Sequence, residues 1–408
     1  MNSRDNRRVV VTGLGVVSSI GIGWQEFWKN CIAGKSGISK IESFDTSKYD
    51  RHFGGEVKDF QPEKYIDRRK LKMMGRASQL AIGASKLAIE DSKLDLKRID
   101  RKRMGICIGT TMGECQVIEE IDSIWTKKDA GSIGANLVPQ YQTSALSANV
   151  GTELGLKDVA YVFSNACAAG NYSIGYGYDL IRSGKADYML AGGSDALSRI
   201  SFTGFSRLYS MAPEKCQPFD KNRQGMLLGE GAGIVVLESL QGAQERKASI
   251  YAEILGYGLS CDAYHMTAPS TAGIMRSMRK ALSSSDISSN DVDYISTHGT
   301  GTVQNDKSEC SAIKKIFGGN GSKFSVSSIK SMLGHAMGAA SAIEAIACCL
   351  AIKDGVVPPT INHETPDPEC DIDCVPNKAK KQTVEVALNN SYAFGGNNAS
   401  LALRKCNG

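Results

Sequence analysis

The pattern of hydrophobic and polar positions along the chain predicts an α/β protein. Short apolar runs at residues 8–15 and 104–108 have the length and β-branched content of buried strands. Residues 77–91 instead space their apolar side chains as a buried helix does. Because strands and helices alternate in this way along the whole chain, we expect helices to cover the faces of one or more sheets.

The alternation is interrupted once, at the polar residues 238–248, which we interpret as a connection. Before it, further strands are predicted at residues 160–163, 188–191 and 231–237. After it, strands are predicted at residues 250–257, 292–296, 323–327, 384–388 and 400–403, and helices at 274–282 and 336–352. The two parts are similar in architecture and not in sequence. We therefore expect two related halves, residues 1–245 and 246–408.

Composition and charge exclude several classes of protein. The 408 residues are 42% hydrophobic and 22% charged, as in an ordinary globular protein. No run of about 20 apolar residues predicts a membrane span. The start, MNSRDNRRVVVTG, lacks the apolar region of a signal peptide, so a cytoplasmic protein is expected. The net charge of +5 is mild, and no basic stripe with interleaved aromatic residues predicts nucleic-acid binding.

The cysteines and the glycine-rich loops give no sign of a metal or a nucleotide. Twelve cysteines without an export signal are expected to be free thiols, most of them buried. Neither the adjacent Cys348 and Cys349 nor the isolated Cys370 and Cys374 have the spacing of a zinc site. Residues 13–18 follow a strand but lack the third glycine and the later acidic residue of a dinucleotide fingerprint.

One cysteine, Cys167, stands where a predicted strand (residues 160–163) meets a predicted helix (residues 171–182). The amides and the dipole at a helix N-terminus stabilise a thiolate. Its neighbours, Ser-Asn-Ala before it and Ala-Ala-Gly after it, are small and leave room for a substrate. A cysteine alone is more often a core residue, so further groups have to support a catalytic role.

Two of the five histidines lie in glycine-rich loops. His298 opens the sequence HGTGT after a predicted strand, and His335 ends the sequence KSMLGH before an alanine-rich helix. Either one alone would more often be a hydrogen-bonded core residue, but two such placements are typical of catalytic residues carried on loops. A cysteine hydrolase would use only one of them and would leave Lys330 unexplained. A fourth segment, NSYAFGGN at residues 390–397, could bring backbone N–H groups near a reacting carbonyl.

These segments, in this order, resemble the β-ketoacyl-acyl-carrier-protein synthases of the thiolase superfamily, in particular the elongating type called synthase II. The likeness covers essentially the whole chain. The motifs that carry it are VTGLGVVSSIG at residues 11–21, AGGSDA at 191–196, PFDKNRQGMLLGEGAG at 218–233, DAYHMTAP at 262–269, HGTGTVQND at 298–306, IKSMLGHAMGAA at 329–340 and VVPPTINHETPDPECDIDCVP at 356–376. The resemblance implies a five-layered thiolase-like α/β/α/β/α fold built from two related halves.

The resemblance also implies a decarboxylative Claisen condensation. Cys167 would accept an acyl chain from a thioester carrier, and a malonyl carrier protein would then lose carbon dioxide and attack that chain. His298 and His335 would stabilise the developing enolate oxygen. Lys330 would support the two histidines, with Glu344 as its charge partner, because a buried lysine without a partner would be costly.

Further residues take supporting roles by the same resemblance. Phe394 would gate the acyl pocket, and its backbone N–H would form an oxyanion hole with that of Cys167. Thr300 and Thr302 would contact the phosphopantetheine arm. The other residues expected to bind substrate are Thr267, Gly395 and Gly396, and those expected to support the site are Asp306 and Glu309.

Some positions depart from the usual pattern of the family. Asn165 stands where threonine is common, and Gln217 stands where arginine is common. Tyr392 and Ala393 alter the gate segment, whose loop we expect to swing less freely. Residues 110–114, TTMGE, replace a more glycine-rich run beside the acyl pocket. The catalytic groups are all retained, and the departures leave the length and saturation of the acyl chain open.

The resemblance implies an acyl carrier protein as partner and no cofactor other than the phosphopantetheine that the carrier brings. We expect the acidic carrier to dock on Arg68, Arg69, Lys127, Lys128 and Arg207, with residues 68–76 forming one basic helix. A dimer is expected, either of two copies or with a chain-length-factor homologue, in fatty-acid or type II polyketide elongation. A non-catalytic partner subunit would lack the cysteine, and a degradative thiolase would need a second catalytic cysteine, for which Cys406 lacks the glycine-rich setting.

Overall fold

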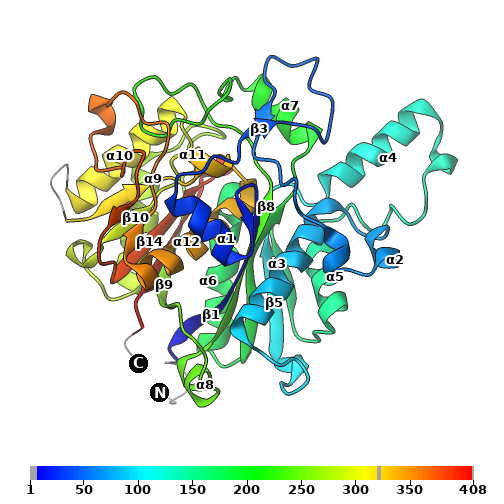
Figure 1. The fold of residues 1–408 in the computed structure, drawn as a ribbon, viewed down its shortest axis with the longest axis horizontal. Coiled ribbons are helices and arrows are strands. Elements are labelled where there is room, and N and C mark those ends of the chain that lie inside the picture. Colours follow the sequence, from blue (N-terminus) through cyan, green and yellow to red (C-terminus); the bar gives the residue numbers. More distant parts are fainter. Residues whose placement is uncertain (1–6, 319–322, 407–408) are drawn as a thin grey trace.

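Two runs of five strands with the same order form the framework of the protein (Figure 1). The computed structural model describes residues 7–318 and 323–406, so residues 1–6, which begin the segment used to predict the absence of a signal peptide, lie outside the described part. The first run consists of β1 (Val9–Ser18), β8 (Gly231–Ser239), β7 (Tyr188–Asp195), β5 (Met104–Gly109) and β6 (Ala160–Phe163). The second consists of β9 (Ala252–Cys261), β15 (Asn397–Arg404), β14 (Val386–Tyr392), β10 (Tyr294–Ser296) and β11 (Ser325–Ser327).

Strand directions repeat as well as strand order. In each run the second strand is antiparallel to the first and to the third, and the last two strands lie parallel to the third. A short antiparallel pairing of β1 with β9, at residues 9–11 and 252–254, joins the two runs. The division into halves at residue 245 stays a proposal, which this repetition supports.

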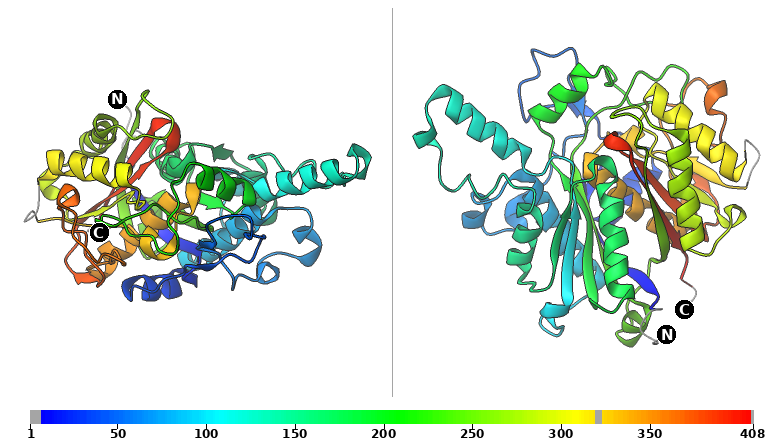
Figure 2. Two further views of the ribbon diagram at one scale, coloured as in Figure 1. Left: turned by 90° about the horizontal axis from the view of Figure 1, so that it is seen from above. Right: turned by 180° about the vertical axis from the view of Figure 1, so that it is seen from behind.

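Helices fill three layers around the two runs (Figure 2). Two helices, α6 (Ala169–Arg182) and α12 (Ala340–Asp354), pack against each other and lie between the runs. The outer face of the first run carries α3 (Arg76–Ser92) and α5 (Ala145–Leu154), and that of the second carries α9 (Thr271–Ser284) and α10 (Val303–Phe317). The predicted α/β/α/β/α fold is therefore confirmed.

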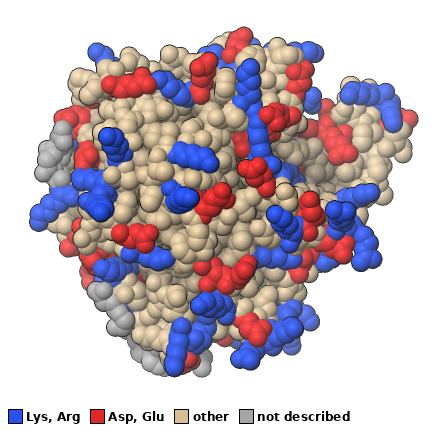
Figure 3. All heavy atoms as spheres, viewed as in Figure 1, with Lys and Arg blue, Asp and Glu red and all other residues tan. Residues whose placement is uncertain are grey.

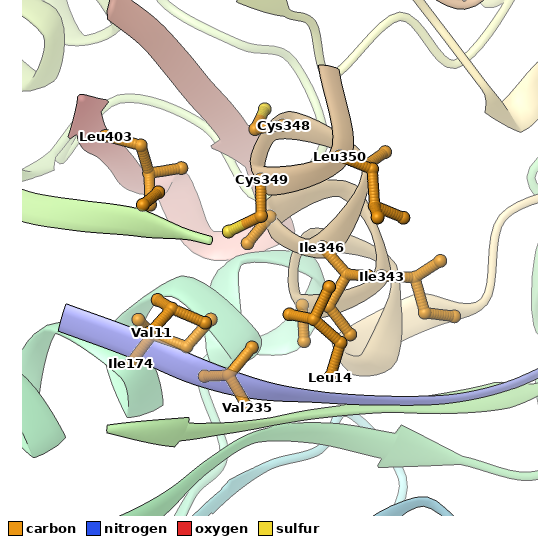
Figure 4. Close-up of a cluster of buried hydrophobic side chains, with 14 of the residues drawn as sticks. Val11, Leu14, Ile174, Val235, Ile343, Ile346, Cys348, Cys349, Leu350 and Leu403 are labelled. Carbon is orange, nitrogen blue, oxygen red and sulfur yellow. The ribbon is translucent and has the colours of Figure 1, made fainter. Parts of the chain in front are cut away.

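The helix α12 is apolar on every side because it lies between the two strand runs. Every residue from Ala340 to Ile352 is buried. Figure 4 shows Ile343 and Ile346 of this helix facing Leu14 of β1 in the same cluster. Cys348 and Cys349 belong to this core, and all twelve cysteines are free thiols, as predicted.

The remaining elements are short, apart from one helix that projects from the N-terminal half (Figures 1 and 2). That helix is α4 (Cys115–Lys127). The other elements are α1 (Trp24–Ile32), α2 (Arg68–Leu71), α7 (Arg199–Arg207), α8 (Leu240–Glu245), α11 (Lys330–Leu333), β2 (Gly21–Ile22), β3 (Ser39–Lys40), β4 (Phe53–Gly54), β12 (Val356–Val357) and β13 (Lys380–Lys381). Within residues 7–318 and 323–406, no helix is long and apolar enough to span a membrane.

The polar stretch at residues 238–248 does connect β8 to β9, and it contains the helix α8, whose first turn is capped by the Ser239 side chain. Two local expectations are wrong. Residues 68–76 do not form one helix, because α2 ends at Leu71 and α3 begins at Arg76. Residues 390–392 lie within β14 and not in a loop that follows a strand.

Candidate active site

A pocket of about 440 Å³ brings together seven of the ten residues expected to catalyse the reaction or bind substrate. Cys167, His298, His335 and Phe394 all line it, although they come from four separate segments of the chain. Other predicted residues that line it are Thr267, Thr300, Thr302, Tyr392 and Ala393. The pocket therefore collects residues from both sides of the proposed division at residue 245.

Cys167 lies in a tight turn between β6 and α6. The preceding Ala166 has a φ of +47°, which is unusual for a residue with a side chain and is held by the surrounding structure. The side chain of Ser391, on β14, donates a hydrogen bond of 2.9 Å to the carbonyl oxygen of Cys167. Burial raises the pKa of the Cys167 thiol to about 12, and the positive charge of Lys330 opposes that shift. The thiolate therefore needs nearby hydrogen-bond donors.

His335 provides such a donor. Its Nε2 atom lies 3.0 Å from Sγ of Cys167. Its Nδ1 atom accepts the backbone N–H of Met337 at 3.2 Å, so we assign the ring proton to Nε2, which then points at the sulfur. Burial, together with Lys330, lowers the pKa of His335 well below the ordinary histidine value, so the ring is neutral at pH 7. In this tautomer His335 donates a hydrogen bond and does not take the proton of the thiol.

His298 stands beside His335, with ring centroids 5.4 Å apart and ring planes at 81°. The carboxylate of Glu309, on α10, accepts the backbone N–H groups of His298 and Gly299, each at 2.8 Å. Burial lowers the pKa of His298 well below the ordinary histidine value, and the positive charge of Lys330 acts in the same direction. Its Nδ1 atom has no hydrogen-bond partner within the described part of the chain. The pocket therefore contains a second neutral imidazole, which can donate or accept a proton.

The predicted ion pair between Lys330 and Glu344 is present. Both side chains are buried, and Nζ of Lys330 contacts Oε1 of Glu344 on α12. Burial raises the pKa of Glu344 to about 7, and the positive charge of Lys330 opposes that shift. Lys330 does not line the pocket, but its charge lowers the pKa of both histidines.

Asp306 and Glu309 support the loop that follows β10. Asp306 is fully buried and accepts the backbone N–H groups of Phe219 at 2.9 Å and Gly301 at 3.2 Å. It also lies 3.7 Å from the guanidinium of Arg223. Burial raises the pKa of Glu309 to about 8, although it accepts two backbone N–H groups. Both carboxyl groups thus fix the path of residues 298–302.

The segment after β14 is tied to the entrance of the pocket. The ring of Phe394 packs on Phe205 with centroids 5.5 Å apart. Gly395 and Gly396 have φ values of +79° and +74°, which glycine adopts readily. The N–H of Gly395 donates to the carbonyl of Met266 at 2.8 Å.

Three threonines that are expected to bind substrate line the pocket. The hydroxyl groups of Thr300 and Thr302 are 2.9 Å apart. Thr267 also lines the pocket, and its N–H donates to Nδ1 of His265 at 3.1 Å. These groups can make hydrogen bonds to amides of a bound arm, because they face the pocket.

The departures from the family pattern fall in two groups. Tyr392 and Ala393 line the pocket, and the ring of Tyr392 stands edge-on to that of His298 at 5.8 Å. Asn165 and Gln217 do not line it. The side chain of Gln217 donates to the carbonyl of Asn362 at 3.0 Å, so it holds two loops together.

Cys167, His298 and His335 could also be considered as a metal site. Their sulfur and nitrogen atoms lie within 4.8 Å of one another, and zinc accepts such ligands. A ligating nitrogen must offer a lone pair, whereas the Met337 amide leaves the proton of His335 on Nε2. The hydrogen bonding of this site therefore fits proton donation better than metal ligation.

The residues predicted to dock a carrier protein are all exposed and lie outside the pocket. Arg68 and Arg69 belong to α2, Lys127 and Lys128 lie at the end of α4, and Arg207 ends α7. Figure 3 shows basic side chains mixed with acidic ones on the face that it presents.

The apolar entrance of the pocket was not predicted from the sequence. Leu208, Tyr209, Met266 and Val303 line the entrance and are each at least half exposed. Met266 and Val303 lie inside motifs already singled out and Leu208 follows Arg207, whereas Tyr209 has no such neighbour. Cys406, considered as a second catalytic cysteine, does not line the pocket.

The repeated strand order with helices between the runs is that of thiolase-like condensing enzymes. The pattern of the family described as "Beta-ketoacyl synthase, N-terminal domain" matches residues 6–243, and that of "Beta-ketoacyl synthase, C-terminal domain" matches residues 251–364. A protein of Synechocystis sp. named 3-oxoacyl-[acyl-carrier-protein] synthase 2 is 40% identical over 414 residues, which cover 99% of this chain and 100% of that protein. The chain belongs to the β-ketoacyl synthase family.

Two solved structures have the same fold over 98% of this chain and 100% of theirs. One is the ishigamide ketosynthase/chain length factor, with 46% identity and a TM-score of 0.95. The other is a type II polyketide synthase acyl-carrier protein in complex with its ketosynthase bound to the hexaketide, with 36% identity and a TM-score of 0.90. The predicted family is confirmed, and the chain is a condensing acyltransferase of chain elongation.

Proposed function

We propose that this chain condenses malonyl-acyl carrier protein with an acyl chain carried on Cys167. The observation that carries the proposal is the contact of His335 Nε2 with the sulfur of Cys167 at 3.0 Å, next to a second neutral imidazole. A nucleophile and two proton donors at one pocket suit a two-step acyl transfer.

In the first half-reaction, the sulfur of Cys167 attacks the carbonyl carbon of an acyl thioester, and the thiol of the carrier leaves with the cysteine proton. The backbone N–H groups of Cys167 and Phe394 would hold the oxyanion of the tetrahedral intermediate. The acyl chain then remains bound to sulfur as a new thioester.

In the second half-reaction, malonyl carrier protein binds in the emptied entrance and loses carbon dioxide. The electron pair of the broken carbon–carbon bond forms an enolate, whose oxygen accepts hydrogen bonds from His298 and His335. The enolate carbon attacks the acyl group, the sulfur of Cys167 leaves, and one proton from solvent restores the thiol. A 3-oxoacyl carrier protein and carbon dioxide are the products.

The proposal is tested by incubating the purified protein with an acyl carrier protein loaded with a short acyl chain and then with malonyl carrier protein. We expect one 3-oxoacyl product and one carbon dioxide for each turnover, measured by mass spectrometry and by release of labelled carbon dioxide. Release of carbon dioxide without a condensed product would refute the condensation.

We further propose that the carrier docks on Arg68, Arg69, Lys127, Lys128 and Arg207. Arg207 precedes two residues of the pocket entrance, Leu208 and Tyr209. Carrier proteins are acidic, and complementary charge steers their encounter. A carrier that docks there could place its arm in the entrance.

Reversing the charge of Arg68 and Arg69 to glutamate should raise KM for the acyl carrier substrate about 10-fold at low salt, because the encounter is then repulsive. The turnover number should change less, because neither residue lines the pocket. The measurement is steady-state kinetics at two salt concentrations, since salt screens such contacts. Arg98 is an exposed arginine paired with Asp95 at 3.3 Å, so Arg98→Glu is the matched control. An unchanged KM at low salt would exclude this docking surface.

We also propose that the protein functions with a homologous second subunit of the chain-length-factor type. The 46% identical neighbour is a ketosynthase with a chain length factor. Strand β6 is the outer strand of its run, and its Tyr161 is 43% exposed. Trp125 on the projecting helix α4 is 61% exposed. An open strand edge and uncovered apolar side chains are typical of a surface that another subunit covers.

We expect the substitution Tyr161→Glu to weaken this assembly, because a charge at the centre of an apolar strand edge opposes pairing. The measurement is native mass after co-expression with a homologue that lacks the cysteine, taken from the same host. Tyr209→Glu is the matched control, since Tyr209 is 84% exposed at the pocket entrance. If the chain alone forms a stable and fully active dimer, the proposal of an unlike partner is wrong.

A further inference from the structure

A buried carboxylate outside the pocket connects two segments that shape the active site. Asp195 is the last residue of β7 and is fully buried. Its Oδ1 atom accepts the hydroxyl of Thr110 at 2.7 Å and the N–H of Met112 at 3.0 Å. Its Oδ2 atom accepts the N–H of Thr111 at 2.8 Å and the N–H of Gly338 at 2.7 Å. Four donors thus converge on one side chain, which is the number that an ionised carboxylate can satisfy.

The first segment, residues 110–113, follows β5 and approaches the pocket wall. The hydroxyl of Thr110 also accepts the N–H of Gly113 at 2.9 Å, which closes the turn. The side chain of Met112 packs in one apolar cluster with Phe394 and Met337. Movement of this turn would therefore disturb the apolar cluster against which Phe394 packs.

The second segment follows His335. The N–H of Met337 donates to Nδ1 of His335, and this bond fixes the proton on Nε2. Met337 has a φ of +54°, a strained conformation that persists only when its surroundings hold it. Gly338, the next residue, packs so closely on the first segment that a Cβ atom would lie 2.7 Å from backbone atoms of Thr110 and Thr111. The hydrogen bond from Gly338 to Asp195 is therefore part of what keeps the Met337 amide in place.

We infer that Asp195 is a positioning residue for the condensation, which it serves by clamping residues 110–112 to the Met337–Gly338 turn and so holding the Nε2–H tautomer of His335. The inference rests on the proposed role of His335 as the donor to the enolate. It assigns Asp195 no contact with substrate, since Asp195 does not line the pocket.

The substitution Asp195→Asn tests this role with little change of shape. An amide NH₂ group would face the N–H groups that now donate to one carboxylate oxygen, so one side of the clamp would open. We expect the rate of condensation to fall about 100-fold, because a catalytic group displaced by about 1 Å loses that much. The transfer of an acyl chain to Cys167, followed by intact mass, should fall less than about threefold. Assays at pH 8 keep the native carboxylate ionised, since burial raises the pKa of Asp195 to about 6.

A second readout follows the proton itself. The ¹⁵N shifts of His335, assigned by comparison with a His335→Ala spectrum, should show the Nε2–H tautomer in the unaltered protein. In the Asp195→Asn protein we expect a mixture of both tautomers. A loss of packing alone would lower stability without changing the tautomer.

Glu114→Gln is the matched control. Glu114 is also buried and accepts the N–H groups of Ala77 at 3.1 Å and Ser78 at 2.7 Å, but none of its hydrogen bonds reaches the Met337–Gly338 turn. The Glu114→Gln protein should retain the Nε2–H tautomer of His335. It should also retain the ratio between the rates of acyl transfer and condensation. If Asp195→Asn does not fold, Thr110→Val removes one of the four donors and should lower condensation several-fold relative to acyl transfer.

Two outcomes would overturn the inference: an unchanged tautomer, or an equal loss in both half-reactions. Failure of the unaltered protein to acylate Cys167 would instead refute the proposed function. The two failures are thus distinguishable.

Discussion

Replacing Cys167 with alanine should abolish both acyl transfer and condensation. Among the residues that the structure describes, the only other sulfur atoms lining the pocket belong to Met226 and Met266, and a thioether cannot form a thioester. We expect the condensation rate to fall by at least about 10³-fold, since the covalent route is lost and the oxyanion donors alone remain. The measurement is intact mass of the protein after incubation with acyl carrier protein, where the adduct should be absent.

Cys261→Ser is the matched control for this result. Cys261 is exposed, whereas Cys167 is only 6% exposed. If acylation depended only on the solvent exposure of a thiol, Cys261 would carry the acyl group and the Cys261→Ser protein would lose it. An acyl adduct that persists in Cys167→Ala would contradict the assignment of the nucleophile.

The reactivity of Cys167 poses a physical question, since burial alone raises the pKa of its thiol to about 12. Two features of the site oppose this rise in the pKa of the thiol. One is the positive charge of Lys330, which stays inside the protein because Glu344 pairs with it. The other is the Nε2–H group of His335, which points at the sulfur. The thiolate is therefore stabilised where the substrate binds and not by exposure to water.

Much of the fold could be predicted because strands and helices carry local signals. The apolar runs at β1 and β8 and the long apolar helix α12 lie close to where periodicity placed them. The break between α2 and α3 could not be predicted in this way. The first N–H groups of α3 are satisfied by Glu114, which is more than 30 positions away in the sequence. Contacts of that kind leave no periodic signal.

The site, too, has residues with a local signal in the sequence and residues whose role depends on distant contacts. Cys167, His298 and His335 could be singled out because each lies in a short segment rich in glycine or alanine, close to the end of a predicted strand or the start of a predicted helix. The role of Asp195 could not be read in the motif AGGSDA, since its four donors come from residues 110–112 and 338. The tautomer of His335 likewise depends on a strained turn at Met337 that the sequence does not reveal.

Removing either active-site histidine should separate the two half-reactions. In His298→Ala we expect condensation to fall about 10²- to 10³-fold, the usual loss for one donor to a developing oxyanion. Acyl transfer should stay within about threefold, because the proposed oxyanion hole for that step uses backbone N–H groups. The measurements are single-turnover acylation followed by intact mass, and release of carbon dioxide from malonyl carrier protein.

His335→Ala should differ from His298→Ala in one respect. Because Nε2 of His335 lies 3.0 Å from the sulfur, its loss also removes a donor to the thiolate. We therefore expect acyl transfer to fall about 10-fold and condensation to fall by at least 10²-fold. A hydrogen bond that only ordered the pocket would instead slow both steps equally.

His52→Ala controls for the loss of any imidazole. His52 bonds the hydroxyl of Thr46 at 3.1 Å and does not line the pocket, so both half-reactions should stay near the unaltered rates. Equal rates of condensation in His298→Ala and the unaltered protein would contradict the proposed role of His298. The decisive result is how the loss in acyl transfer compares with the loss in condensation for each histidine. A donor that serves only the enolate affects one half-reaction, whereas a donor shared by sulfur and enolate affects both, with the larger loss in condensation.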